Sequence, residues 1–399
     1  MLRLSLSLLL CCGSQAFVVT LSGSARPQYI TTFASPALKL PSRSQRAALP
    51  VAAAEIAAPS PPPPSSIISP LAQFSLLLGA YWLHISWLSE TFFHLRLFKW
   101  RIEVPGENAI GVLVVGACAW AIRRGGRAER ARKTIVERAQ RQLPWGEVTT
   151  NRLLLIQTTA TLLACYLFSG YVGHAVEFGL DSLVALGVPG LTVSRHRAIH
   201  VLLTHLAWVG MAIRVLGVRL RPFFPPPFGQ GKWVRARFKQ PSWLLWALGG
   251  YFASLLTYNA VECANIAILP PIPEGSLLLE KESVVAKLVS PEAGDLLALG
   301  IGSIGPCLTA PLFEELLYRG FLLPALCRFL PLNLALILHA LLFGLHHHAL
   351  PALLPLSALG LLWGLLYVAS GNLVVSACVH ALWNGRIFLT SLLEMAAPV

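Results

Sequence analysis

The sequence has little charge, and acidic side chains are especially scarce. Charged residues make up 12% of its 399 residues, and 18 Asp and Glu stand against 31 Lys and Arg, while 55% of the residues are hydrophobic. Soluble domains carry about twice that share of charge. Together with a mean hydropathy of +0.64, this scarcity excludes an ordinary soluble domain and predicts a polytopic helical membrane protein.

The formal net charge of +13 does not predict a nucleic-acid partner. The basic residues cluster in loops between apolar segments, not on an amphipathic face with interleaved aromatic residues. We therefore expect a lipid bilayer as the surrounding partner and no nucleic acid.

Two motifs that would define other chemistries are missing. None of the eight cysteines stands in a CxxC pair, and the sequence contains no HExxH motif. The cysteines beyond the N-terminal region lie in apolar context and are predicted to be small buried hydrophobic residues: Cys118, Cys165, Cys263, Cys307, Cys327 and Cys378.

The first 54 residues contain no Asp or Glu and are rich in Ser, Thr, Ala and Arg, which is typical of a transit peptide. A short apolar core follows Arg3, and small residues flank a possible cleavage point between Ala16 and Phe17. This arrangement resembles the bipartite leaders of proteins sent to complex plastids. The alternative is a secretory signal that leads to the endoplasmic reticulum. The proline-rich residues 58–64 predict an extended linker.

Apolar segments of spanning or near-spanning length follow the linker, each bounded by charge, Pro or Gly. We expect an all-α fold, a polytopic transmembrane bundle of about eight or nine helices. The segments lie at about 71–89, 107–122, 153–179, 199–218, 243–268, 296–325, 331–349, 352–370 and 372–391.

Two strongly basic loops, 123–141 and 219–239, fall on the same side of the membrane if each apolar segment crosses it. By the positive-inside rule that side is stromal or cytoplasmic, and the more acidic segment 262–295 lies opposite. The basic residues of 96–101 do not fit this scheme, so residues 71–104 are expected to be partly interfacial.

The segment 311–320, PLFEELLYRG, places two carboxylates and a guanidinium in an apolar run. Each charge at mid-bilayer costs about 3 kcal/mol, so the three cost roughly 9 kcal/mol before pairing. Glu315 and Arg319 stand at i and i+4 with the acid first, the favourable order for an ion pair on a helix. Glu314 is left without a local partner, and is the carboxylate available for other chemistry.

Two later helices carry histidines at helical spacing from other side chains. Phe343 and His347 are four residues apart, as are His380 and Asn384, so each pair projects from one helical face. His346 and His348 are predicted to be interface or loop residues, because only His347 shares the face of Phe343. We expect His339 to pack between helices, and the GLLWG segment with Gly360 and Gly364 to permit close helix packing.

These motifs resemble those of the CAAX-protease and bacteriocin-processing (CPBP, or Abi) family of intramembrane endopeptidases. The resemblance covers about residues 295–391 and does not extend to residues 71–290. The family marks EExxxR, FxxxH and HxxxN stand here as Glu314, Glu315 and Arg319, as Phe343 and His347, and as His380 and Asn384.

The resemblance implies a role for each of these side chains. Glu314 and His347 would activate the attacking water, and Glu315 and Arg319 would hold the architecture of the site. His380 and Asn384 would act as oxyanion donors. Donors in a dry site stabilise developing negative charge strongly, so the residue types suit these roles.

The family is often labelled as metalloproteases, and this leaves the cofactor open. Glu314, His347 and His380 would supply three ligands to a divalent ion such as zinc, with a fourth position for water. A metal-free glutamate mechanism fits the same residues.

The predicted function is an intramembrane endopeptidase, similar to type 2 CAAX prenyl proteases, that acts on a membrane-associated polypeptide. The alternative is a non-catalytic membrane scaffold or maturation factor on the same fold. A transporter is less compatible, because the sequence shows no repeated halves with paired broken helices. The predicted division of the chain is a leader at 1–54, a linker at 55–70, N-terminal helices at 71–290 and a catalytic core at 291–399.

Overall fold

The computed structural model describes residues 68–97, 100–125, 151–221, 234–239, 242–268, 284–347 and 350–396. The predicted leader with its cleavage point, most of the linker, most of both basic loops and His348 lie outside these ranges. The described residues belong to one compact unit.

The N-terminal half consists of long helices and one hairpin. In order these are α1 (Pro70–Leu83) with a π-helical continuation η1 (His84–Leu88), β1 (Phe92–Leu97), β2 (Trp100–Pro105), α2 (Gly106–Gly125), α4 (Arg152–Ala185), α5 (Val193–Arg219) and α6 (Trp243–Ile268).

The C-terminal half begins with α7 (Val284–Val289) and η4 (Glu292–Gly294) and continues as one long interrupted helix. Its parts are α8 (Leu296–Ile304), η5 (Gly305–Thr309), α9 (Ala310–Glu315), η6 (Leu316–Leu322) and α10 (Leu323–Leu326). Three helices and a short turn then complete the chain: α11 (Leu332–His346), η7 (Leu350–Ala352), α12 (Leu353–Ser370) and α13 (Leu373–Ala396).

The long helices begin at residues whose side chains cap the first turn. Asn151 accepts hydrogen bonds from the backbone of α4, Thr192 caps α5 and Asp295 caps α8. At the end of α12, Gly371 adopts a left-handed conformation with φ of 62°, which glycine enters at little cost. Local polar chemistry therefore sets these boundaries, while hydropathy sets the lengths.

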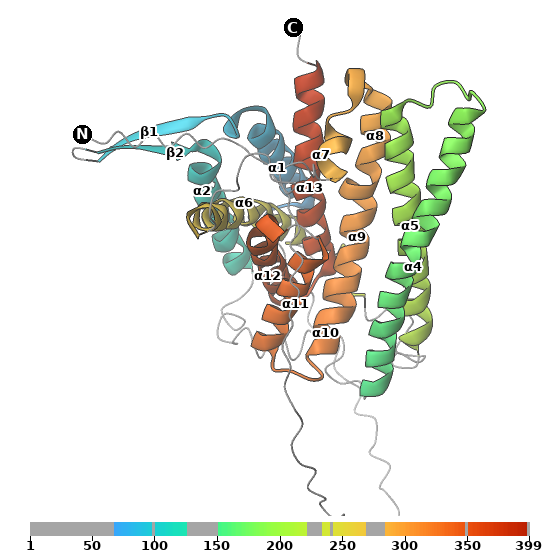
Figure 1. Cartoon of the computed structure of the whole chain (residues 1–399). Coiled ribbons are helices and arrows are strands. Elements are labelled where there is room, and N and C mark those ends of the chain that lie inside the picture. The colour runs from blue at the N-terminus through green and yellow to red at the C-terminus, as the bar shows by residue number, and fades with distance from the viewer. Residues whose placement is uncertain are drawn as a thin grey trace, which may run out of the picture. The chain divides into compact units, whose positions relative to one another are not determined.

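The predicted all-α membrane bundle is confirmed, and each of the nine predicted segments contains a helix. Seven of the described helical segments are long and apolar enough to cross a membrane. The other two are α2, which carries Glu107, Arg123 and Arg124, and α11, which has only 15 residues. Figure 1 shows α4, α5, α8–α10 and α13 aligned along one direction, whereas α6 runs across it.

The hairpin β1–β2 is the feature that departs from an all-helical chain. It is antiparallel, and it pairs Phe92 with Pro105 and Leu97 with Trp100. These residues fall in the segment whose charges did not fit the predicted topology. Its interfacial position stays a prediction.

Two sets of hydrogen bonds join segments that are distant in the sequence. The connection between α4 and α5 meets the start of α8, because Arg195 Nε and Thr192 Oγ1 both donate to Asp295 Oδ2, at 2.7 and 2.9 Å. Residues 234–239 instead meet the turn between α12 and α13, where Asn372 exchanges hydrogen bonds with the backbone of Arg237. The placement of the acidic and basic segments on opposite sides of the membrane stays a prediction.

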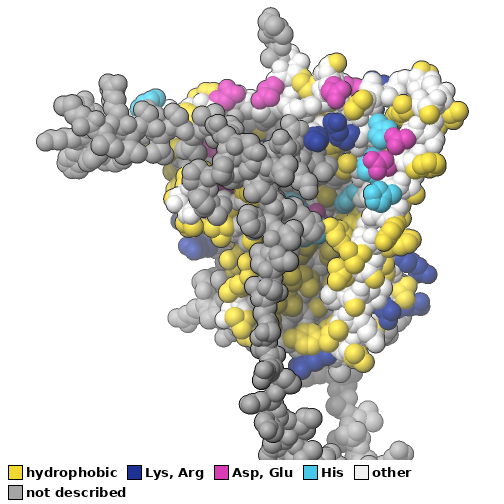
Figure 2. All heavy atoms as spheres, viewed as in Figure 1, with side chains coloured by type: hydrophobic (Ala, Val, Ile, Leu, Met, Phe, Trp, Pro, Cys, Tyr) yellow, Lys and Arg dark blue, Asp and Glu magenta, His cyan; other side chains and the backbone are white. Residues whose placement is uncertain are grey.

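The surface of the bundle is largely apolar where helices are aligned. On the face shown in Figure 2, hydrophobic side chains cover the middle, and acidic and histidine side chains gather toward the end where α13 finishes. Exposed Leu167, Phe168 and Tyr171 on α4 belong to the apolar surface of the described helices. A lipid bilayer is the environment that such a surface fits.

Candidate active site

The helix that carries the two glutamates alternates between α-helical and π-helical turns. The π-helical turns are Gly305–Thr309 and Leu316–Leu322, and Pro306 and Pro311 lie in this segment. Proline removes a backbone donor and clashes with the preceding turn, which favours a wider turn there. Glu314 and Glu315 end the short α-helical piece between the two wide turns.

Glu315 and Arg319 form the predicted ion pair. Arg319 Nη1 donates to Glu315 Oε1 at 2.6 Å, and both side chains are fully buried. Arg319 Nη2 also donates to the carbonyl oxygen of Gly360 at 2.9 Å. A Cβ at Gly360 would come within 3.1 Å of Phe343, so glycine lets α12 approach α11 at this point.

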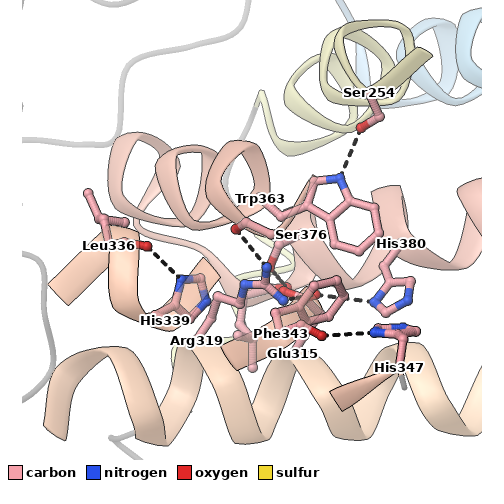
Figure 3. A network of polar contacts seen from close by, with 12 residues as sticks. Ser254, Glu315, Arg319, Leu336, His339, Phe343, His347, Trp363, Ser376 and His380 are labelled. Atoms are coloured by element: carbon pink, nitrogen blue, oxygen red, sulfur yellow. Dashed lines mark hydrogen bonds and ion pairs between the residues drawn. The ribbon is translucent and has the colours of Figure 1, made fainter. Parts of the chain in front are cut away.

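His380 joins the pair from α13. Its Nδ1 lies 3.2 Å from Glu315 Oε1, so the carboxylate accepts from the imidazole as well as from Arg319 (Figure 3). Hydrogen bonds between charged groups are stronger than neutral ones, and this pair is shielded from water. Glu315 therefore orients two side chains at once, which supports the architectural role predicted for it.

Glu314 lies beside this group without joining its hydrogen bonds. It is close enough to His380, Glu315 and Arg319 for the charges to interact. Among the described residues, its buried Oε2 has no hydrogen-bond partner. The predicted division between a paired and an unpaired glutamate is therefore seen in the structure.

Phe343 connects the second motif to the third. Its ring centroid lies 4.9 Å from that of His347 and 6.0 Å from that of His380, so both imidazoles contact one aromatic ring. His347 follows the last residue of α11, and its Nδ1 lies 2.8 Å from the carbonyl oxygen of Phe343. Unlike His380, His347 is exposed, so it lies at the rim of the group and not within it.

Asn384 lies one turn beyond His380 on α13, as the spacing predicts. Its Nδ2 donates to the carbonyl oxygen of Pro306 at 2.8 Å. This bond ties α13 to the first π-helical turn of the glutamate helix. An amide nitrogen has two hydrogens, so one N–H remains for another acceptor.

The proposed ligands Glu314, His347 and His380 do not form a metal site in the described residues. No group of three His, Cys, Asp or Glu side chains there is arranged to hold a metal ion. The physical reason is that His347 sits at the exposed end of α11, and its Nδ1 is directed to the Phe343 carbonyl. The ligand set predicted from the sequence therefore does not fit this geometry.

Several neighbours of the site were not expected from the sequence. Trp363 lies over the imidazole of His380, with ring centroids 4.3 Å apart and planes 34° apart. Its Nε1 donates to Ser254 Oγ on α6 at 2.9 Å. Trp363 belongs to the GLLWG segment that the sequence indicated for packing, but nothing in the sequence relates it to Ser254.

His339 and Gly364 do have the packing role predicted for them. His339 is fully buried, and a Cβ at Gly364 would lie 3.0 Å from its Cε1. The predicted close approach of α11 and α12 is confirmed by this contact. His346 contacts two aromatic rings, Tyr166 on α4 and Tyr318 on η6, which fits the interface role predicted for it.

An apolar groove of about 390 Å³ runs along the glutamate helix. Its lining comes from this helix, including Leu312 and Leu316, from α13, including Ala377 and Ala381, and from residues 234–238 and Trp243. The groove is almost entirely apolar, so it fits a hydrophobic chain better than a polar one.

Glu315, Arg319 and His380 therefore form a buried polar group in a membrane-type helical bundle, with Glu314 beside it and His347 at its rim. Residues 297–386 match the family model described as "Type II CAAX prenyl endopeptidase Rce1-like". All of the motif residues fall within this match, so the predicted family resemblance is confirmed and this segment is an Rce1-like domain. Comparisons with curated proteins and with solved structures found no match.

Proposed function

We propose that this multi-pass membrane protein is an endopeptidase that hydrolyses a peptide bond of a membrane-associated polypeptide with water activated by Glu314. The observation that carries the proposal is the contrast between two adjacent carboxylates. Glu315 is held by Arg319 and His380, whereas Glu314 Oε2 is buried with no hydrogen-bond partner among the described residues. A buried acceptor left unpaired is costly and suits a group that receives a proton during a reaction.

The proposed reaction begins with water placed between Glu314 and the scissile carbonyl. Glu314 takes a proton as the water oxygen bonds to the carbonyl carbon, and His347 orients the water from the rim of the site. The bond between the carbonyl carbon and the amide nitrogen then breaks, and the proton passes from Glu314 to the leaving nitrogen. No step is assigned to a metal ion, because the described ligands do not converge.

His380 is proposed to stabilise the oxyanion from its other ring nitrogen. Its Nδ1 faces Glu315, so Nε2 is the nitrogen that faces a substrate. Asn384 would supply a second, uncharged donor.

The proposed substrate is a membrane-associated polypeptide because the apolar groove runs beside the glutamate helix. Leu308 and Leu312 of this groove are more than half exposed at the surface of the bundle. An apolar part of the substrate would lie there, while the peptide bond reaches the polar group. The sequence of the substrate is not selected by any described contact. We propose a plastid membrane as the location, on the composition of the first 54 residues.

The proposal is tested with purified protein in liposomes and a library of quenched fluorescent peptides, each tethered by one acyl or prenyl chain. Glu314→Gln keeps the shape of the side chain but removes the base, so we expect cleavage at least ~10²-fold slower with an unchanged melting temperature. Glu177→Gln is the matched control, because Glu177 is half-exposed on α4. A Glu314→Gln variant that cuts as fast as the parent would overturn the mechanism.

The scaffold alternative makes a different prediction in the native organism. A scaffold needs the fold but not the base, so Glu314→Gln would then rescue a null strain as well as the parent does. An endopeptidase requires the opposite result, in which the rescue fails and uncut substrate accumulates. Mass spectrometry of new protein N-termini in the two strains identifies that substrate.

A further inference from the structure

A chain of contacts leads from His380 to a helix outside the Rce1-like domain. Trp363 on α12 covers the imidazole of His380, and Ser254 on α6 accepts a hydrogen bond from the indole (Figure 3). Ser254 is fully buried, and its hydroxyl donates to the carbonyl oxygen of Gly250 at 2.8 Å. The hydroxyl hydrogen is therefore directed to α6 itself, and an oxygen lone pair is directed to Trp363.

Close packing holds α6 in the place that this chain requires. A Cβ at Gly250 would come within 2.8 Å of Val379 and 2.9 Å of Leu366, so a larger residue would have to displace these side chains of α13 and α12. Val379 directly precedes His380 in sequence. The helix that supplies Ser254 is thus fixed against the helix that supplies His380.

Two perpendicular restraints act on the imidazole. The hydrogen bond between Nδ1 and Glu315 holds one edge of the ring in place. The indole of Trp363 lies over the face of the ring and limits its tilt. With both restraints in place, Nε2 points in a single direction.

We propose that Ser254 and Trp363 are positioning residues that hold His380 in the orientation its oxyanion role requires. The role rests on the proposed function, in which His380 Nε2 faces the substrate. Ser254 sets the rotation of the indole, and the indole sets the tilt of the imidazole. Part of the site architecture therefore comes from α6, which lies outside residues 297–386.

Kinetics of three variants in the liposome assay test the proposal. We expect Ser254→Ala to lower kcat about fivefold with little change in KM, because His380, once less firmly held, would stabilise the transition state less well while substrate binding is unaffected. A fivefold change in kcat corresponds to about 1 kcal/mol. Trp363→Phe keeps an aromatic face but loses the N–H, so it should lower kcat to a similar extent. Adding Ser254→Ala to Trp363→Phe should cost little more, because both remove the same bond.

A matched control separates positioning from a loss of stability. Ser169 on α4 is also buried, and its hydroxyl donates to the Tyr166 carbonyl of its own helix. Ser169→Ala removes a comparable hydroxyl far along the sequence from the site, so kcat per folded molecule should stay at the parent value. An equal fall in kcat for Ser169→Ala and Ser254→Ala would overturn the proposal.

A second measurement does not depend on catalysis. Deuterium exchange at the imidazole Cε1 position, followed by mass spectrometry, reports how freely His380 moves. In Ser254→Ala and Trp363→Phe we expect exchange at His380 to become several-fold faster, while exchange at the buried His339 stays unchanged. Unchanged exchange at His380 in both variants would refute the positioning role.

The two measurements also separate this inference from the proposed function. If the parent cuts in a Glu314-dependent manner but Ser254→Ala changes neither kcat nor exchange, the endopeptidase proposal stands and the positioning role fails. If Glu314→Gln cuts as fast as the parent while exchange at His380 rises in Ser254→Ala, the restraint on the ring stands and the proposed chemistry fails.

Discussion

Two polar networks among the described residues differ in how completely their atoms are paired. The site network consists of Glu314, Glu315, Arg319 and His380. The body network consists of His84 on η1, Glu107 on α2, and Tyr251 and Asn259 on α6.

The body network satisfies its central carboxylate. His84 Nε2 lies 2.9 Å from one oxygen of Glu107, Asn259 donates to the other, and Tyr251 meets His84 Nδ1 at 2.7 Å. In the site network, Glu314 Oε2 and Arg319 Nε have no partner among the described residues.

This difference indicates what each network does. Buried polar atoms are nearly always hydrogen-bonded, because an unpaired one costs about 1–3 kcal/mol. The body network has the properties of a tie between helices. The site network retains polar atoms that have no hydrogen-bond partner among the described residues, as the proposed function expects where a substrate and water complete the hydrogen bonds.

The largest expected effect comes from removing the cation of the site network. Arg319→Ala leaves Glu315 buried without its main partner, and we expect a loss of about 3–5 kcal/mol in the free energy of unfolding. Yield and melting temperature in detergent measure the loss. Arg214→Ala, at an exposed position of α5, is the control and should change little. A stable but inactive Arg319→Ala variant would show that Arg319 takes part in the chemistry and is not needed for the architecture of the site.

The proposed donors should affect catalysis more than stability. We expect His380→Ala and His347→Ala to cut at least ~10²-fold more slowly, which corresponds to about 2.7 kcal/mol in the transition state. Asn384→Ala should also be impaired, although its bond to the Pro306 carbonyl gives it a share in packing. Initial rates normalised to folded protein are the measurement. Normal rates for His380→Ala would show that the third motif is structural.

A substitution in the body network should reverse this pattern. Glu107→Gln weakens two charged hydrogen bonds, so we expect a loss of about 1–3 kcal/mol in stability and an unchanged kcat per folded molecule. The control is Glu177→Gln, which breaks a pair with His174 whose side chains are largely exposed and should cost almost nothing. A fall in kcat for fully folded Glu107→Gln would show that the body network also affects catalysis, which would contradict the separate roles given to the two networks.

The smallest expected effect lies outside both networks. A hydrogen bond from Arg195 holds the pKa of Asp295 below its ordinary value of 3.8. Because the folded pKa is the lower one, this bond stabilises the protein above that ordinary value, and the gain disappears as pH falls through the folded pKa. The difference in melting temperature between the parent and Asp295→Asn should therefore be small near neutral pH, begin to shrink as pH falls through about 3.8, and vanish only below the folded pKa. A difference that persists in acid would contradict this account.

Hydropathy and spacing predicted the helices and much of the site. The length of each apolar run indicates whether it forms a membrane helix, and i,i+4 spacing decides which side chains share a helical face. The Glu315–Arg319 pair and the unpaired Glu314 could therefore be predicted from the sequence. The π-helical turns could not be predicted, because they depend on backbone hydrogen bonds and not on residue type alone, and the contact between Ser254 and Trp363 could not, because single-sequence patterns do not specify which helices become neighbours.

Other features were left open by the sequence, or were missed, for similar reasons. The sequence left a metal ion open and named Glu314, His347 and His380 as its ligands if one is bound, but α11 ends at His346 and leaves His347 at the rim of the group. The hairpin β1–β2 was missed because its sequence lacks a strong turn signal and carries charges that suggested an interfacial helix. The family match and the motifs agree on residues 297–386, while the predicted domain boundaries stay predictions.

The wide turn at Leu316–Leu322 makes the length of the glutamate helix part of its chemistry. A π-helical turn holds about one residue more than an α-helical one, and each residue advances the helix by roughly 100°. Deleting a single codon here would remove no motif if it took Leu316 or Leu317, and hydropathy would barely change. It would still turn Arg319 about a quarter of a circle away from Glu315. Insertions and deletions in this segment should therefore be far less tolerated than substitutions among its leucines.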